Sequence, residues 1–198
     1  MNELLTRLGV PMDIQAFFNI SEELSFQYGD TNEHYGEGFH KIPTTVNLWM
    51  AGEETALEVI VTYCAMEAIA FITINRQRYP KLEELAFVAI GNKLQEEQAN
   101  WIRQKFQKRK FTLVFGCDLL GHLTDIKLGA GLKNIPIRIQ HSNFKVLIYR
   151  RDKLRVFDED VISFHAFQLA FGIRGKIRTR KPIKSLTFLD QLKNDTYR

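Results

Sequence analysis

The chain has 198 residues, 45% of them apolar and 12% aromatic, which suits one folded domain and argues against disorder. No apolar run approaches the roughly 20 residues of a membrane-spanning helix, and residues 1–5 lack the features of a secretory signal, so we expect no membrane partner. The net charge of +4 is uneven, with a balance of +7 in residues 141–198 and −3 in residues 1–140, which favours a polyanionic partner.

The first 56 residues predict short elements. Residues 3–8 and 13–18 have the character of short helices. Aromatic and polar residues mix with glycines at 24–28, 35–40 and 46–50, which predicts short antiparallel strands. These strands are expected either on the edge of a sheet or in a small N-terminal layer packed on the core.

Residues 57–140 alternate between two patterns. Short β-branched runs predict strands, and the segments between them carry apolar residues at helical spacing. The strands are predicted at 58–63, 85–90, 111–115 and 135–139, and the helices at 65–76, 94–106 and 119–132. Strands that alternate with helices of this length form right-handed β-α-β units. We therefore predict an α/β fold with a Rossmann-like, mainly parallel sheet flanked by helices.

The last third predicts a hairpin at 144–149 and 154–157, then a helix over 161–171 and a basic extension. Together with the N-terminal side, it supplies the antiparallel strands of the predicted fold. No repeat or low-complexity linker divides the chain. We expect one compact unit made of residues 1–56, an α/β core at 57–140 and residues 141–198.

The core resembles the Toprim domain of bacterial primases, topoisomerases and related nucleases. The resemblance rests on a strand and helix, a second strand ending at Gly91, and a third strand followed by Asp118 and Gly121. It covers roughly residues 57–140. The extended aromatic segment at 47–50 also resembles the flanks of Toprim-like proteins from mobile elements and phage-type primases.

The sequence departs from the Toprim pattern at its acidic residues. In the family, a Glu ends the first strand and an Asp-x-Asp pair ends the third, and these residues perform acid–base chemistry and hold Mg²⁺. Here Tyr63 and Gly116 replace the Glu and the first Asp. Only Asp118 and the nearby Glu67 remain as remnants of a catalytic site, so the resemblance implies a degenerate protein without a cofactor.

Each remaining polar residue has two interpretations. Asp118 could bind a metal, or cap the helix that begins at residue 119. Glu67 could help to bind a metal, or lie solvated in the first turn of its helix. His122 and Asp125 are three residues apart, which by default indicates a surface pair on one helix.

The two cysteines, Cys64 and Cys117, fall at strand ends without metal-ligand spacing. They could be reactive, but buried structural cysteines are common. Because no disulfide framework is indicated, we expect a reduced, cytoplasmic protein.

The strongest signal outside the core is residues 174–184, in which six of eleven residues are basic and none is acidic. Lysines and arginines on an extended segment suit contacts with phosphates. Residues 105–110 form a second basic cluster. The alternative is a solvated extension that balances the acidic residues 158–160. The candidate nucleic-acid-binding residues are Arg174, Lys176, Arg178, Arg180, Lys181 and Lys184.

These observations lead to a degenerate Toprim-like protein of a bacterial primase- or mobile-element-associated system. We expect it to bind DNA or RNA, or a replication or mobilisation protein. The main alternative is a Mg²⁺-dependent phosphoryl-transfer enzyme, primase- or nuclease-like, with a site built on Asp118, Glu67 and Asp125. A third possibility, a nucleotide or small-molecule pocket, lacks a glycine-rich phosphate loop.

Overall fold

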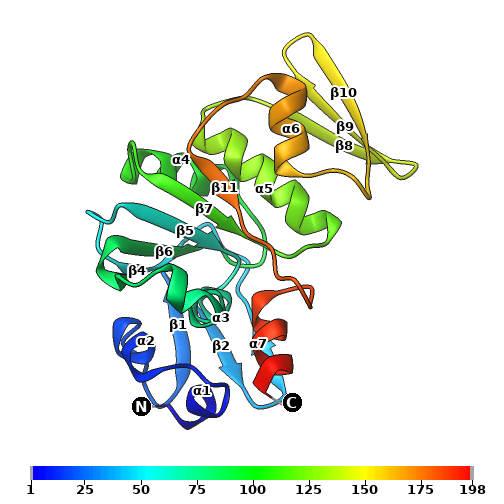
Figure 1. The fold of residues 1–198 in the computed structure, drawn as a ribbon. Coiled ribbons are helices and arrows are strands. Elements are labelled where there is room, and N and C mark those ends of the chain that lie inside the picture. Colours follow the sequence, from blue (N-terminus) through cyan, green and yellow to red (C-terminus); the bar gives the residue numbers. More distant parts are fainter. Residues whose placement is uncertain (1, 197–198) are drawn as a thin grey trace.

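A five-stranded sheet runs through the middle of the molecule in the computed structural model, which describes residues 2–196 (Figure 1). Four of its strands are parallel, and β4 pairs antiparallel with β6 at one edge. The strand order is β11 (Ile177–Thr179), β7 (Lys110–Val114), β5 (Glu58–Thr62), β6 (Leu85–Ala89) and β4 (Trp49–Gly52). The predicted α/β class with a mainly parallel sheet is therefore confirmed.

Helices cover both faces of this sheet because successive strand residues point to opposite sides. On β5, Ile60 packs into the core beneath α3 and α7, while Val59 and Val61 pack into the core beneath α4 and α5. All three side chains are fully buried, as expected of a central parallel strand. The helices are α3 (Ala65–Asn75), α4 (Glu96–Lys105), α5 (Leu119–Leu132) and α7 (Phe188–Thr196).

The N-terminal elements pack on the α3 side of the sheet. They comprise two short helices and a three-stranded antiparallel sheet, namely α1 (Glu3–Arg7), α2 (Met12–Phe17), β1 (Leu24–Tyr28), β2 (Thr31–Gly36) and β3 (Phe39–Lys41). The buried Glu33 carboxylate joins this layer to the core, because it accepts hydrogen bonds from the N–H groups of Ala65 and Met66 at the start of α3. These N–H groups have no partner within their own helix, so the carboxylate satisfies them.

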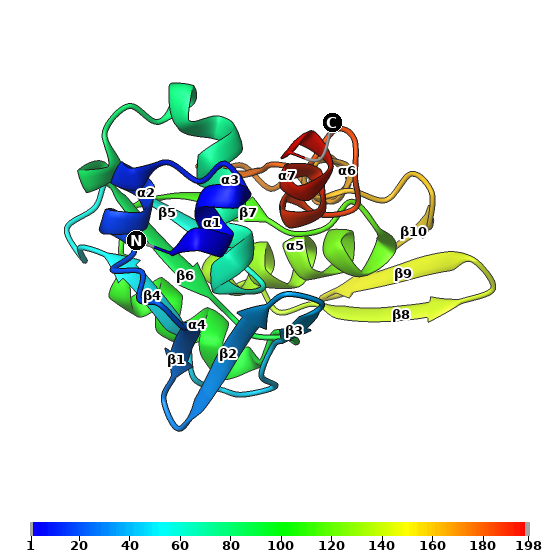
Figure 2. The same cartoon turned by 90° about the horizontal axis from the view of Figure 1, so that it is seen from below.

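The opposite end of the molecule is a second antiparallel sheet covered by one helix, and Figure 2 shows β8 and β9 projecting beyond α5. It consists of β8 (Arg138–Ser142), β9 (Lys145–Arg150), β10 (Lys153–Asp158) and α6 (Phe164–Phe171). Val146 and Ile148 of β9 pack with Phe167 of α6 and Ile126 of α5. This small core fastens the second sheet to the five-stranded one.

Residues 135–139 were predicted to be a fourth strand of the parallel sheet, and that prediction is wrong. Residues 138–142 do form a strand, but it pairs antiparallel with β9. Asn143 and Phe144 join the two strands with positive φ angles of 52° and 59°, the backbone of a tight hairpin turn. The fourth parallel strand is β11, which lies inside the basic segment that was predicted as an extension.

The other predicted boundaries differ only locally. The helix predicted at 161–171 begins at Phe164, because Ser163 caps it. The strand predicted at 35–40 is divided by a turn between β2 and β3, and the strand predicted at 46–50 lies on the edge of the sheet as β4. Two short 3₁₀ turns, Arg76–Arg78 and Leu82–Glu84, connect α3 to β6. Among residues 2–196, no helix combines the length and apolar character needed to cross a bilayer.

Gly121 is needed where α5 begins against the end of β7. A Cβ atom at this position would lie 2.0 Å from the carbonyl oxygen of Gly116, which is backbone and has little freedom to move. We expect Gly121→Ala to lower the free energy of unfolding by about 2 kcal/mol or more, measured by urea denaturation.

The matched control is Gly172→Ala, which adds the same methyl group where no atom lies within 4 Å. Its cost is limited to the positive φ of 61°, about 1 kcal/mol. Equal losses in the two variants would contradict the proposed clash at Gly121.

Candidate functional site at the carboxyl edge of the sheet

Tyr63 and Gly116, the two positions at which the sequence departs from the pattern it resembles, lie at the ends of neighbouring strands. Tyr63 follows β5, its ring meets Phe115 edge-on at 4.6 Å, and its hydroxyl group forms a 2.8 Å hydrogen bond with Thr124. Burial raises the pKa of Tyr63 to about 12, so it cannot act as a base near neutral pH. Gly116 follows β7, and a Cβ atom there would lie only 3.1 Å from a carboxylate oxygen of Asp118.

Asp118 caps α5. Its Oδ1 atom accepts a 2.8 Å hydrogen bond from the N–H group of Gly121, and its backbone is extended, as in other N-cap residues. Of the two interpretations, the helix cap is therefore confirmed. Metal binding by Asp118 stays a prediction, and it would compete with this hydrogen bond.

Glu67 is neither solvated nor directed into an open crevice. Its side chain is buried and accepts hydrogen bonds from the N–H groups of Phe188 at 2.6 Å and Leu189 at 3.0 Å. These are the first residues of α7, so Glu67 on α3 caps a helix 121 residues later in the chain. Burial raises the pKa of Glu67 to about 7, although the two N–H groups oppose this rise.

Asp125 does not form the predicted surface pair with His122. It has no exposed area, and its Oδ2 atom lies 2.6 Å from the Nζ atom of Lys181. The ammonium group also donates hydrogen bonds to the carbonyl oxygens of Gly116 at 2.7 Å and Phe115 at 3.2 Å. A fixed cation therefore lies at the end of β7. Burial raises the pKa of Asp125 to about 7, against the lowering effect of Lys181.

The chain that brings Lys181 to this position is the C-terminal strap, residues 180–187, which connects β11 to α7. Its Leu186 carbonyl oxygen accepts a 3.0 Å hydrogen bond from the N–H group of Cys117. The same oxygen lies 3.3 Å from where a Cβ atom of residue 116 would be. The strap thus covers the end of β7, and an aspartate at position 116 would have little room.

The basic segment 174–184 divides into anchored and free side chains. Arg178 forms an ion pair with Glu58 at 2.6 Å, and Lys184 lies 3.4 Å from Asp195. With Lys181, three of the six candidate nucleic-acid-binding residues therefore have acidic partners. Within residues 2–196, the side chains of the remaining three form no ion pair, and these are Arg174, Lys176 and Arg180.

The structure adds basic residues that the sequence analysis did not single out. Arg150 and Arg155 donate hydrogen bonds to the last carbonyl oxygens of α6, those of Phe171 and Ala170. Lys133 at the end of α5 donates to the backbone of Arg174. We call Lys133, Arg150, Arg155 and Arg174 the α6-end cluster. The first three are spread over 23 residues of sequence, from Lys133 to Arg155, so no charge run marked them.

The two cysteines differ in environment. Cys117 is exposed, and its thiol lies 3.4 Å from the carbonyl oxygen of Ser185 in the strap. Cys64 is buried at the start of α3, where its sulfur accepts a hydrogen bond from the N–H group of Glu67. Burial and the nearby carboxylates of Glu33 and Glu67 raise the pKa of the Cys64 thiol well above its usual range, so it is not an activated nucleophile.

Comparison with protein families, curated proteins and solved structures found no match to this chain. The Toprim resemblance therefore stays a prediction. The role of the residues at the carboxyl edge of the sheet is therefore inferred from their contacts in this structure.

The buried carboxylate of Glu67 gives a pH-dependence that can be measured. Its pKa rises on folding from an ordinary value of 4.5 to about 7, so the folded state binds protons more tightly than the unfolded state. The free energy of unfolding should therefore fall as pH rises from about 4.5 to 7. We expect Glu67→Gln to reduce this fall by an amount on the order of 1–3 kcal/mol, measured by urea denaturation at pH 4.5 and 8.

The exposed Glu83→Gln is the control for loss of a carboxyl group at the surface. It should leave the pH-dependence of the wild type intact. If Glu67→Gln also leaves it intact, the raised pKa of Glu67 is wrong.

Proposed function

We propose that this chain is a catalytically degenerate Toprim-like protein that binds nucleic acid, in a bacterial primase- or mobile-element-associated system. Replication or mobilisation proteins are the other partners in this proposal. The observation that carries it is the group of unpaired basic side chains around β11, at one edge of the five-stranded sheet.

The contacts that the acidic residues already make favour nucleic-acid binding over phosphoryl transfer. A Mg²⁺ site usually needs one or two carboxylates that are free to face the substrate phosphates. Asp118 caps α5, Glu67 caps α7 and Asp125 pairs with Lys181. A metal site built on these three residues would have to release two helix caps and one buried ion pair.

Lys181 supports the same conclusion. Its ammonium group lies against the carbonyl oxygen of Gly116, where the resemblance implies a metal-binding aspartate pair. An ammonium group can balance the charge of Asp125, but it cannot activate a water molecule as a divalent metal does. We infer that Lys181 stabilises the degenerate edge rather than contacting nucleic acid.

The free cations surround the edge strand. Arg174 and Lys176 precede β11 and Arg180 follows it, while Arg178 between them is held by Glu58. The α6-end cluster extends this positive surface from Arg174 onto β9 and β10. Cations spread along an extended segment match the spacing of phosphates, and they contact the backbone of DNA or RNA without reading its sequence.

The test is to remove the three free charges together, by Arg174→Ala, Lys176→Ala and Arg180→Ala in one chain. Binding to single-stranded DNA, single-stranded RNA and duplex DNA would be measured by fluorescence polarisation over a range of salt concentrations. We expect a loss of affinity of about 10-fold or more at low salt. The slope of log affinity against log salt should become shallower by about 2–3.

The matched control removes three exposed positive charges elsewhere, with Lys41→Ala, Arg78→Ala and Lys93→Ala. It keeps the same net charge as the first variant, and it should retain most of the affinity. Equal losses in both variants would mean that only overall charge matters. Absence of salt-dependent binding by the wild type would exclude nucleic acid as the partner.

A further inference from the structure

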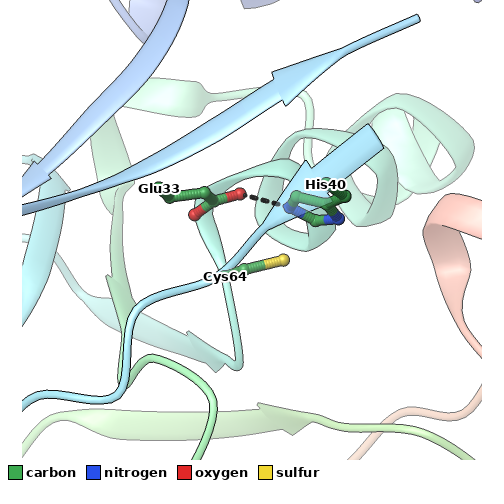
Figure 3. A group of neighbouring side chains, drawn as sticks. All are labelled: Glu33, His40 and Cys64. Carbon is green, nitrogen blue, oxygen red and sulfur yellow. Dashed lines mark hydrogen bonds and ion pairs between the residues drawn. The ribbon is translucent and has the colours of Figure 1, made fainter. Parts of the chain in front are cut away.

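Three side chains of types that ligate metals lie together between the N-terminal sheet and the start of α3. Glu33 comes from β2, His40 comes from β3 and Cys64 is the N-cap residue of α3, and Figure 3 shows the three side chains close to one another. A carboxylate oxygen, an imidazole nitrogen and the thiol sulfur all lie within 4.8 Å of one another. The cluster therefore joins the N-terminal sheet to the core.

The carboxylate of Glu33 is held in a fixed orientation. Its Oε2 atom accepts hydrogen bonds from Tyr28 at 2.9 Å and from the N–H group of Ala65 at 2.7 Å. Its Oε1 atom accepts one from the N–H group of Met66 at 3.1 Å and lies 2.9 Å from the Nε2 atom of His40. Donors that orient a carboxylate in this way are typical of the surroundings of metal ligands.

The surroundings of the cluster are acidic. Glu33 has no exposed area, and the buried Glu67 and Cys64 lie beside it. His40 is the only basic side chain that contacts Glu33 among the described residues. Because buried carboxylates are stabilised by hydrogen bonds or by a compensating charge, a cation at this point would add to the stabilisation that the hydrogen bonds already give.

The types of ligand identify the metal. One sulfur, one imidazole nitrogen and one carboxylate oxygen suit Zn²⁺, which accepts all three, whereas Mg²⁺ and Ca²⁺ prefer oxygen alone. Two nitrogen or oxygen ligands of a tetrahedral zinc ion lie about 3.3 Å apart, and a sulfur ligand lies about 3.6 Å from either. The 2.9 Å separation between Glu33 and His40 would have to widen by a few tenths of an ångström.

His40 can move to widen this separation. It lies on β3, a strand of three residues at the edge of its sheet, and its side chain is 20% exposed. The imidazole can therefore move outward, and its exposed side gives a path from solvent. Cys64 and Glu33 are fixed by the packing around α3.

We propose that Glu33, His40 and Cys64 form a Zn²⁺ site with three protein ligands and a fourth position open to water. Binding would release the thiol proton of Cys64 to solvent, and His40 would bind through the lone pair of Nε2 and carry its proton on Nδ1. Glu33 would bind through Oε1 and keep its hydrogen bonds to Tyr28 and Ala65. The bound ion would fasten the N-terminal sheet to the start of α3.

Cobalt is the probe for the test, because a thiolate bound to Co²⁺ gives a charge-transfer absorption band that other ligands do not. The full chain, without an affinity tag and treated with chelator, would be titrated with Co²⁺ and then with Zn²⁺. We expect one Co²⁺ per chain, a thiolate band, and displacement by one equivalent of Zn²⁺. Cys64→Ser should lose the band, and Cys117→Ser should keep it.

Thermal unfolding gives a second readout that does not rely on the absorption band of the thiolate. Free Zn²⁺ at 100 times its dissociation constant should raise the Tm of the wild type by about 5–10 °C. The rise should be absent in His40→Gln, whose amide can still donate a hydrogen bond to Glu33. A folded wild type without a thiolate band would overturn the proposal, as would a band that disappears with Cys117→Ser and survives Cys64→Ser.

Discussion

A carboxylate removed from water must receive hydrogen bonds or a counter-charge, and this constraint organises the edge where the strands end. The buried carboxylates of Glu33 and Glu67 lie against the first N–H groups of α3 and α7, and the exposed Asp118 caps α5 in the same way. Asp125 receives the ammonium group of Lys181 instead. The contacts of Glu33, Glu67 and Asp125 join elements that lie apart in the chain, so these three buried acids determine how the layers meet.

The elements that were predicted correctly are those whose formation depends on residues close together in the sequence. Between residues 58 and 132, strands and helices follow from the burial of β-branched runs and from apolar residues at helical spacing. The helix predicted at 119–132 has the observed bounds, because Asp118 caps it and its first turn follows the strand directly. Gly121, which the sequence analysis named only as part of the Toprim resemblance, lies at this junction, where a Cβ atom would meet the backbone of Gly116.

The rest depends on contacts between distant residues. The alternating apolar residues at 135–139 are compatible with a strand in either sheet. The hairpin turn at Asn143 directs the following strand back along residues 138–142, and the two strands pair antiparallel. The edge strand β11 has three residues within a basic run, where Arg178 is tolerated because Glu58 faces it from β5. The pairing of Asp125 with Lys181 leaves no spacing in the sequence, because the two residues lie far apart in the chain. Glu33 and His40 are seven residues apart, but Cys64 reaches them from a different part of the fold.

The two proposals concern separate parts of one structure. A metal held by Glu33, His40 and Cys64 would lie between the N-terminal sheet and α3, whereas the free cations surround β11 and the end of α6. The first would act through the stability of the fold, because its ligands belong to three elements joined only by burial and hydrogen bonds. The second would act through surface charge, which a distant buried ion changes little in salt solution. Failure of one would therefore leave the other standing, and removing zinc should weaken the fold well before it weakens the binding of phosphates.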